Sequence, residues 1–127
     1  MRTAGYISLD RAAKKKAYQS METAARMIKE GTSVVIFPEG ARSFDGSLQP
    51  FMKGGFTLAI KAGVPICPVT ITGSWRIMPR TTLRIKKGDI KIIISEPIDT
   101  KGLTMQDRRS LMQQVEDRIR EGLARAA

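Results

Sequence analysis

The chain has 127 residues, of which 42% are hydrophobic and 27% charged, the composition of an ordinary globular domain with one modest core. We therefore predict a single domain over residues 1–127. No apolar run is long enough to cross a bilayer as a helix, and the N-terminus lacks a signal-peptide pattern. One cysteine and no histidine exclude an internal disulfide and a structural zinc site.

The charge balance indicates an anionic partner. Lysine and arginine number 22 against 12 acidic residues, a formal net charge of +10. Anionic membranes and nucleic acids both attract such an excess. Because only seven residues are Phe, Trp or Tyr and no nucleic-acid motif is present, we expect no nucleic-acid partner and favour phosphate-bearing lipids and a membrane surface.

The first third of the chain predicts a strand and a helix. Tyr6 to Leu9 is a short strand candidate, and Asp10 is suited to cap a helix that runs to about Glu30. Gly31 then ends the helix. The expected buried stripe of this helix is Tyr18, Met21, Ala25 and Ile28.

Val34 to Phe37 is β-branched and aromatic, which predicts a strand over Ser33 to Phe37 that is buried on both faces. Pro38 stops its ladder, and Gly40 permits a sharp reversal. Glu39 and Arg42 would then lie at the carboxyl edge of a sheet, where open α/β sheets bind ligands. The alternative is a surface turn with an incidental ion pair. A loop as long as Pro38 to Lys53 is commonly functional.

The second half of the chain predicts a short helix, a further strand and a hairpin. A short helix from about Gly55 to Ala62 leads into a strand from Ile66 to Ile71, where Cys67 is expected as a buried core thiol. Leu83 to Lys86 and Ile90 to Ser95 form a hairpin signal, and the second of these strands lacks alternation, so we expect it to be buried on both sides.

A final helix opens after the capping-box-like Thr104-Met105-Gln106-Asp107. Its expected apolar stripe, which should pack on the sheet, is Leu111, Val115, Ile119 and Leu123. The order of these predicted strands and helices along the chain predicts an α/β layered domain with a mixed, largely parallel sheet flanked by helices.

Four motifs occur in order between Gly5 and about Ile71. They are Gly5-Tyr6-Ile7-Ser8-Leu9-Asp10-Arg11, Phe37-Pro38-Glu39-Gly40-Ala41-Arg42-Ser43, Phe51-Met52-Lys53-Gly54-Gly55-Phe56 and Val64-Pro65-Ile66-Cys67-Pro68-Val69. Together they resemble the phospholipid/glycerol acyltransferase family, whose type members are 1-acyl-glycerol-3-phosphate acyltransferases. The motif from Phe37 to Ser43 departs from the commonest family form, with Ala41 where Thr is usual.

The resemblance implies transfer of a fatty acyl group from acyl-CoA or acyl-ACP, as co-substrate, to 1-acyl-glycerol-3-phosphate, giving phosphatidic acid without a bound cofactor. In the family, a His followed four residues later by an Asp provides the base, upstream of the motif that corresponds here to Gly5 to Arg11. This chain has no histidine. We therefore expect an N-terminally truncated domain that lacks its catalytic residues and is inactive by itself, with Asp10, Glu39 and Asp45 as the remaining carboxylates.

The resemblance also assigns an acceptor site. Arg11 and Arg42 would bind the phosphate through bidentate hydrogen bonds, with Lys53 as a further point charge. Glycines at 40, 54 and 55 would let backbone amides approach the phosphate oxygens. Glu39 would orient Arg42 or accept a hydrogen bond from a glycerol hydroxyl, or else only lock the turn.

The resemblance implies peripheral attachment to the cytoplasmic face of the cell membrane, where Trp75 is suited to the interface or to capping the sheet. A non-catalytic basic module that binds acidic phospholipid is the alternative function.

Overall fold

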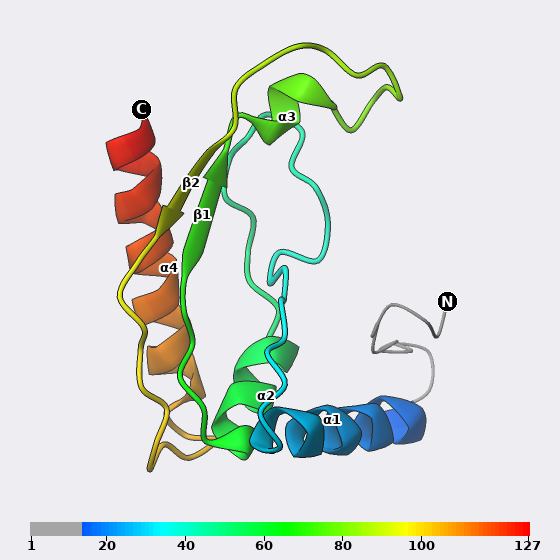
Figure 1. The fold of residues 1–127 in the computed structure, drawn as a ribbon. Helices are drawn as coiled ribbons and strands as arrows, with labels where there is room; N and C mark the ends of the chain where they lie inside the picture. Colours follow the sequence, from blue (N-terminus) through cyan, green and yellow to red (C-terminus); the bar gives the residue numbers. More distant parts are fainter. Residues whose placement is uncertain (1–13) are drawn as a thin grey trace.

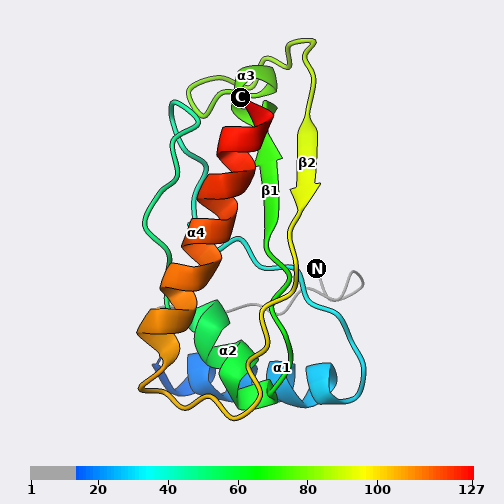
Figure 2. The ribbon, with the colours of Figure 1, turned by 90° about the vertical axis from the view of Figure 1, so that its left-hand side faces the viewer.

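The computed structural model describes the backbone of residues 14–127 and the side chains from Gln19 onward. Its elements in chain order are α1 (Lys14–Lys29), α2 (Gly54–Ala62), β1 (Val69–Thr72), α3 (Ser74–Ile77), β2 (Lys91–Ile94) and α4 (Arg108–Ala126). The strands form an antiparallel pair, α4 runs alongside them, and α2 and α1 lie at one end (Figures 1 and 2). The chain is thus a mixed helix and strand structure with a small sheet.

The larger core cluster joins α4 to α2. Leu111 and Val115 of α4 are fully buried against Phe56 and Ile60 of α2, at the spacing that the sequence predicts. Further along, α4 lies directly on β1, where the hydroxyl of the buried Thr70 donates to a helix carbonyl. One face of the strand pair is therefore covered by α4.

A second cluster joins α1 to α2. Ala24 and Ala25 pack against Leu58 and Ala62. The helix ends at Lys29 rather than Glu30, and the amides of residues 31 and 32 donate to the carbonyls of residues 28 and 27. This is the Schellman pattern, with Gly31 at a φ of 100°. The predicted helix end at Gly31 is confirmed.

The predicted strand over Ser33 to Phe37 is wrong for this structure, because this segment has no ladder partner among the described residues. The side chains of Val35 and Phe37 are 83% and 72% exposed, against the expected burial. A buried parallel strand requires neighbours on both sides, and the segment's own residues cannot supply them.

Of the predicted hairpin, the second strand is confirmed and its pairing with residues 83–86 is wrong. A strand forms at Lys91–Ile94 within the expected range, but its partner is β1 rather than residues 83–86. Within the described residues the sheet has only this antiparallel pair, so the largely parallel sheet is not confirmed.

The burial predicted for the second strand is also wrong. Ile92 and Ile94 are 61% and 71% exposed. They pair with Ile71 and Val69 across the ladder and so share the sheet face opposite the α4-facing Thr70. Absence of alternation here marks an apolar surface rather than a buried strand.

Cys67, expected in the core, is exposed. Its thiol lies 3.6 Å from the carbonyl oxygen of Ser95. The neighbouring Pro68 is buried instead, because adjacent residues in extended chain point to opposite sides. The predictions for Tyr6 to Leu9, Asp10 and Arg11 lie outside the described residues. No described helix has the length and apolar character needed to span a membrane.

Candidate functional site

The loop between Phe37 and Gly54 is closed at its neck. The amide of Met52 donates to the carbonyl oxygen of Pro38 at 2.8 Å. At the start of the loop, the amide of Gly40 donates to the carbonyl of Phe37, and Gly40 has a φ of 69°. The predicted reversal at Gly40 is confirmed, and the neck brings the Glu39 turn beside the Lys53 end of the loop.

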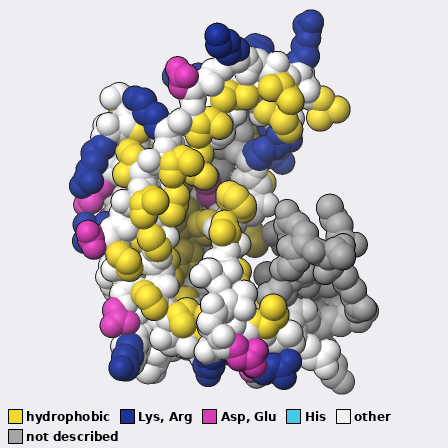
Figure 3. All heavy atoms as spheres, viewed as in Figure 1, with side chains coloured by type: hydrophobic (Ala, Val, Ile, Leu, Met, Phe, Trp, Pro, Cys, Tyr) yellow, Lys and Arg dark blue, Asp and Glu magenta, His cyan; other side chains and the backbone are white. Residues whose placement is uncertain are grey.

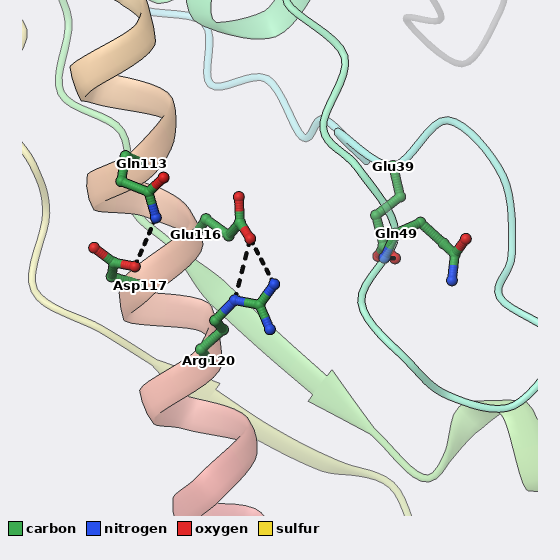
Figure 4. A network of polar contacts seen from close by, with 6 residues as sticks. All are labelled: Glu39, Gln49, Gln113, Glu116, Asp117 and Arg120. Atoms are coloured by element: carbon green, nitrogen blue, oxygen red, sulfur yellow. Dashed lines mark hydrogen bonds and ion pairs between the residues drawn. The ribbon is translucent and has the colours of Figure 1, made fainter.

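Glu39 stabilises the loop from inside. Its half-buried carboxylate accepts a hydrogen bond from the backbone amide of Gln49 at 2.7 Å, so it links the two limbs of the loop. Figure 4 shows both residues on the loop, separate from the polar pairs along α4. No ion pair joins Glu39 to Arg42 in the described part of the chain. The ion pair that was the alternative interpretation of the turn is therefore absent, and no contact among the described residues lets Glu39 orient the Arg42 guanidinium.

Arg42 is exposed, and a second arginine lies against it. The guanidinium of Arg80 donates to the carbonyl oxygen of Arg42 at 3.2 Å and stacks 4.4 Å from the ring centroid of Phe44. The sequence does not reveal Arg80 as part of the site, because Arg80 lies 38 residues from Arg42. The only local signal was its position in a basic stretch after Trp75.

Lys53 and the two following glycines form the start of α2. Lys53 is the N-cap residue, and no side chain caps this end. The glycines are closely packed, since a Cβ on Gly55 would lie 3.0 Å from the Ile36 side chain and one on Gly54 would lie 3.5 Å from Met21. Gly55 thus allows residues 33–37 to pack on α2, a packing role that the sequence did not reveal.

Asp45 is poorly suited to act as a general base. Hydrogen bonds from Ser47, first its side chain and then its backbone amide, hold the pKa of the Asp45 carboxyl below its usual value. A base that activates a hydroxyl near neutrality needs its pKa raised instead. The Asp45 carboxylate therefore stabilises the turn by accepting the hydrogen bond of the Ser47 amide.

The described residues contain no cluster of three or more metal-ligating side chains. Among the predicted acceptor residues, Glu39 and Lys53 are the chain neighbours of Pro38 and Met52, whose backbone hydrogen bond closes the loop, and Arg42 is exposed two residues beyond Gly40. Arg11 lies outside the described residues. The arrangement places cationic groups and an uncapped helix start around a turn that a carboxylate stiffens, which is suited to binding an anion.

Comparisons with known proteins show which family the chain belongs to. A family model described as Acyltransferase matches residues 1–72. A chloroplastic 1-acyl-sn-glycerol-3-phosphate acyltransferase of Brassica napus is 42% identical over 95 residues, which are 74% of this chain and 28% of that protein. The human 1-acyl-sn-glycerol-3-phosphate acyltransferase alpha is 33% identical over 121 residues, covering 94% of this chain and 41% of its own length.

A solved structure is also similar, that of the 1-acyl-sn-glycerophosphate acyltransferase PlsC from Thermotoga maritima. The TM-score is 0.77 at 32% identity, with 87% of this chain and 45% of that chain covered. The chain thus spans less than half the length of each of these three proteins. Because the family model covers more than half of its residues, the chain belongs to the Acyltransferase family.

Proposed function

We propose that this chain is the acceptor-binding portion of a 1-acyl-glycerol-3-phosphate acyltransferase. The complete enzyme would transfer an acyl group from acyl-CoA or acyl-ACP to 1-acyl-glycerol-3-phosphate, at the cytoplasmic face of a membrane. The relatives carry this name, and a backbone hydrogen bond makes the two ends of the 38–53 loop, next to Glu39 and Lys53, converge. That convergence is the observation that carries the proposal.

The acceptor phosphate would be held by Arg42, with Arg11 of the motif from Gly5 to Arg11 as its partner. The exposed Arg42 guanidinium has no ion-pair partner among the described carboxylates, so its donors are available for a phosphate fork. Lys53 adds a point charge at the start of α2, where helix amides favour an anion. Glu39 is occupied by the Gln49 amide, so its role is to keep the turn in shape.

The chain does not supply the usual base for this reaction. Attack of a hydroxyl on a thioester needs a group that accepts its proton, and no histidine occurs in the 127 residues. We therefore expect no acyl transfer from long-chain acyl-CoA to 1-acyl-glycerol-3-phosphate by the purified chain. Turnover at an ordinary enzymatic rate would contradict this part of the proposal and require a different base.

Acceptor binding is tested with glycerol 3-phosphate, the water-soluble head group, by calorimetry on the whole chain. Arg42→Gln should weaken binding about tenfold or more, since it removes charge-assisted hydrogen bonds. Arg42→Lys should restore only part of the affinity, because Lys lacks the planar fork. Arg109→Gln, at an exposed position on α4, is the matched control. Equal affinities for all variants would refute the phosphate role of Arg42.

A further inference from the structure

The connection between the two strands exposes apolar and basic side chains together. We call residues 74–87, which comprise α3 and the chain after it, the basic tip. It contains five basic residues and no acidic one: Arg76, Arg80, Arg84, Lys86 and Lys87, all exposed. Its exposed apolar residues are Trp75, Met78, Leu83 and Ile85. Leu83 and Ile85 are 87% and 76% exposed, so large branched side chains face solvent between the charges.

Backbone contacts hold the basic tip in this shape. The amide of Lys86 donates to the carbonyl of Ile77 at 2.7 Å, which joins the end of the tip to α3. At its base, a Cβ on Gly73 would collide with the carbonyl of Asp89. The basic tip projects at the end of the molecule furthest from α1 and α2 (Figure 1), and Figure 3 shows apolar and basic side chains side by side there.

The basic tip is continuous with the candidate acceptor site. The Trp75 indole lies so close to Gly46 that a Cβ there would collide with it, and Arg80 contacts both Phe44 and the carbonyl of Arg42. Phe44 is itself 65% exposed and extends the apolar surface toward Arg42. Arg80 of the tip therefore lies next to Arg42.

We propose that the basic tip docks on a lipid bilayer that contains anionic lipids. Leu83 and Ile85 would enter the interface, Trp75 would lie at head-group depth, and the five cations would contact anionic head groups. The inference deepens the proposed function and rests on its membrane partner. It brings the membrane-bound acceptor to Arg42 without the head group leaving the surface.

A bilayer fits this surface better than a nucleic acid does. Phosphate backbones would pair with the cations but offer nothing to the exposed Leu83 and Ile85 side chains, whose burial is favourable. Binding of single strands relies on stacked aromatic rings, and the basic tip has only Trp75, which Arg76 already covers at 5.3 Å. Charge and apolar exposure together therefore select an anionic membrane surface.

The test uses the whole chain and vesicles without lysophospholipid, so it can fail or succeed independently of acceptor binding. Vesicles of phosphatidylcholine alone are compared with vesicles of phosphatidylcholine and phosphatidylglycerol, by flotation and by tryptophan emission. Trp75 is the only tryptophan in the chain, so a blue shift of emission reports on the tip itself. We expect the shift and co-flotation with the anionic vesicles, weakened at high salt because screening shortens the reach of the charges.

Two pairs of variants separate the tip from the rest of the surface. The double variant Leu83→Thr/Ile85→Thr should weaken binding about tenfold or more. Its matched control, Ile92→Thr/Ile94→Thr, changes equally apolar and exposed residues on the sheet face and should bind normally. The triple variant Arg84→Gln/Lys86→Gln/Lys87→Gln should lose roughly 100-fold, since each cation near the surface contributes about fivefold. Its control, Lys101→Gln/Arg109→Gln/Arg125→Gln, removes the same exposed charge elsewhere.

Three results would overturn the proposal. They are equal losses in a tip variant and its control, equal binding to neutral and anionic vesicles, and a Trp75 emission that stays unchanged while the chain co-floats. If the basic variant loses affinity for an RNA oligonucleotide while the Leu83/Ile85 variant binds vesicles normally, the partner is nucleic acid and the membrane proposal is wrong. Loss of vesicle binding with glycerol 3-phosphate binding intact would support a docking role separate from the acceptor site.

Discussion

At the residue scale, Thr100 shows how a buried polar side chain joins segments that are distant in the sequence. It is 1% exposed, and its hydroxyl lies 2.7 Å from the carbonyl of Val64 and 3.3 Å from that of Ala59. The Ala59 carbonyl also accepts hydrogen bonds from backbone amides beyond the end of α2. The Val64 carbonyl accepts its hydrogen bond from the Thr100 hydroxyl. Thr100 thus fixes the chain that follows α2 against the segment that precedes α4.

We predict that Thr100→Val lowers the free energy of unfolding by about 1–3 kcal/mol, because valine fills the space but leaves the Val64 carbonyl buried without its hydroxyl donor. Urea denaturation of the whole chain measures the change. Thr81→Val, at an exposed position, is the control and should alter stability little. Equal stability of the Thr100 variant and the parent chain would show that water replaces the hydroxyl there.

At the element scale, the close packing of α4 on the sheet depends on Gly122. A Cβ at this position would collide with the Thr70 hydroxyl and lie 2.9 Å from the Thr70 Cβ. Gly122 is buried although it stands in a helix interior, where glycine is less favourable than alanine by about 1 kcal/mol. The close approach of helix and strand explains why glycine is accommodated here.

Helix propensity therefore predicts that Gly122→Ala raises the free energy of unfolding, whereas packing predicts that it lowers it. We expect packing to dominate, because the neighbouring atoms are a β-branched side chain on a paired strand, and we expect a destabilisation of about 1–3 kcal/mol. The double variant Thr70→Ala/Gly122→Ala should recover part of the loss, since it removes the clash. A stabilised Gly122→Ala variant in thermal unfolding would show that α4 can shift away from β1 at little cost.

At the scale of the whole molecule, the chain exposes more surface than its mass requires. A compact monomer of 14.0 kDa is expected to expose about 6,700 Å², whereas this chain exposes 9692 Å². The excess on this one chain is larger than the roughly 800 Å² that each partner buries in a standard interface. Part of it is the apolar sheet face formed by Val69, Ile71, Ile92 and Ile94, all of them exposed.

We predict that the purified chain binds the dye ANS and self-associates as its concentration rises, because contiguous apolar patches of this kind are rarely left in solution. The double variant Ile92→Thr/Ile94→Thr should reduce both effects while keeping a strand-compatible side chain. Dye fluorescence and sedimentation velocity provide the measurements. A strictly monomeric parent chain with no dye binding would contradict the exposure of this sheet face.

Features that depend on neighbouring residues followed from the sequence. The apolar stripes of α1 and α4 were correct at Ala25, Leu111 and Val115, because helical periodicity is a local property. The helix end at Gly31 and the turn at Gly40 were correct because their conformations need φ > 0, which glycine adopts readily. The family was also recognised from the sequence, since each of its motifs is a short continuous segment.

The tertiary structure decided which distant segments meet. It paired β2 with β1 rather than with residues 83–86, left Ile92 and Ile94 exposed, and turned Cys67 outward. It packed Ile36 on Gly55 and brought Arg80 to Arg42, contacts between residues far apart in the chain. An apolar run in the sequence shows only that a segment is able to be buried. Whether it is covered depends on the surfaces that the rest of the fold places against it.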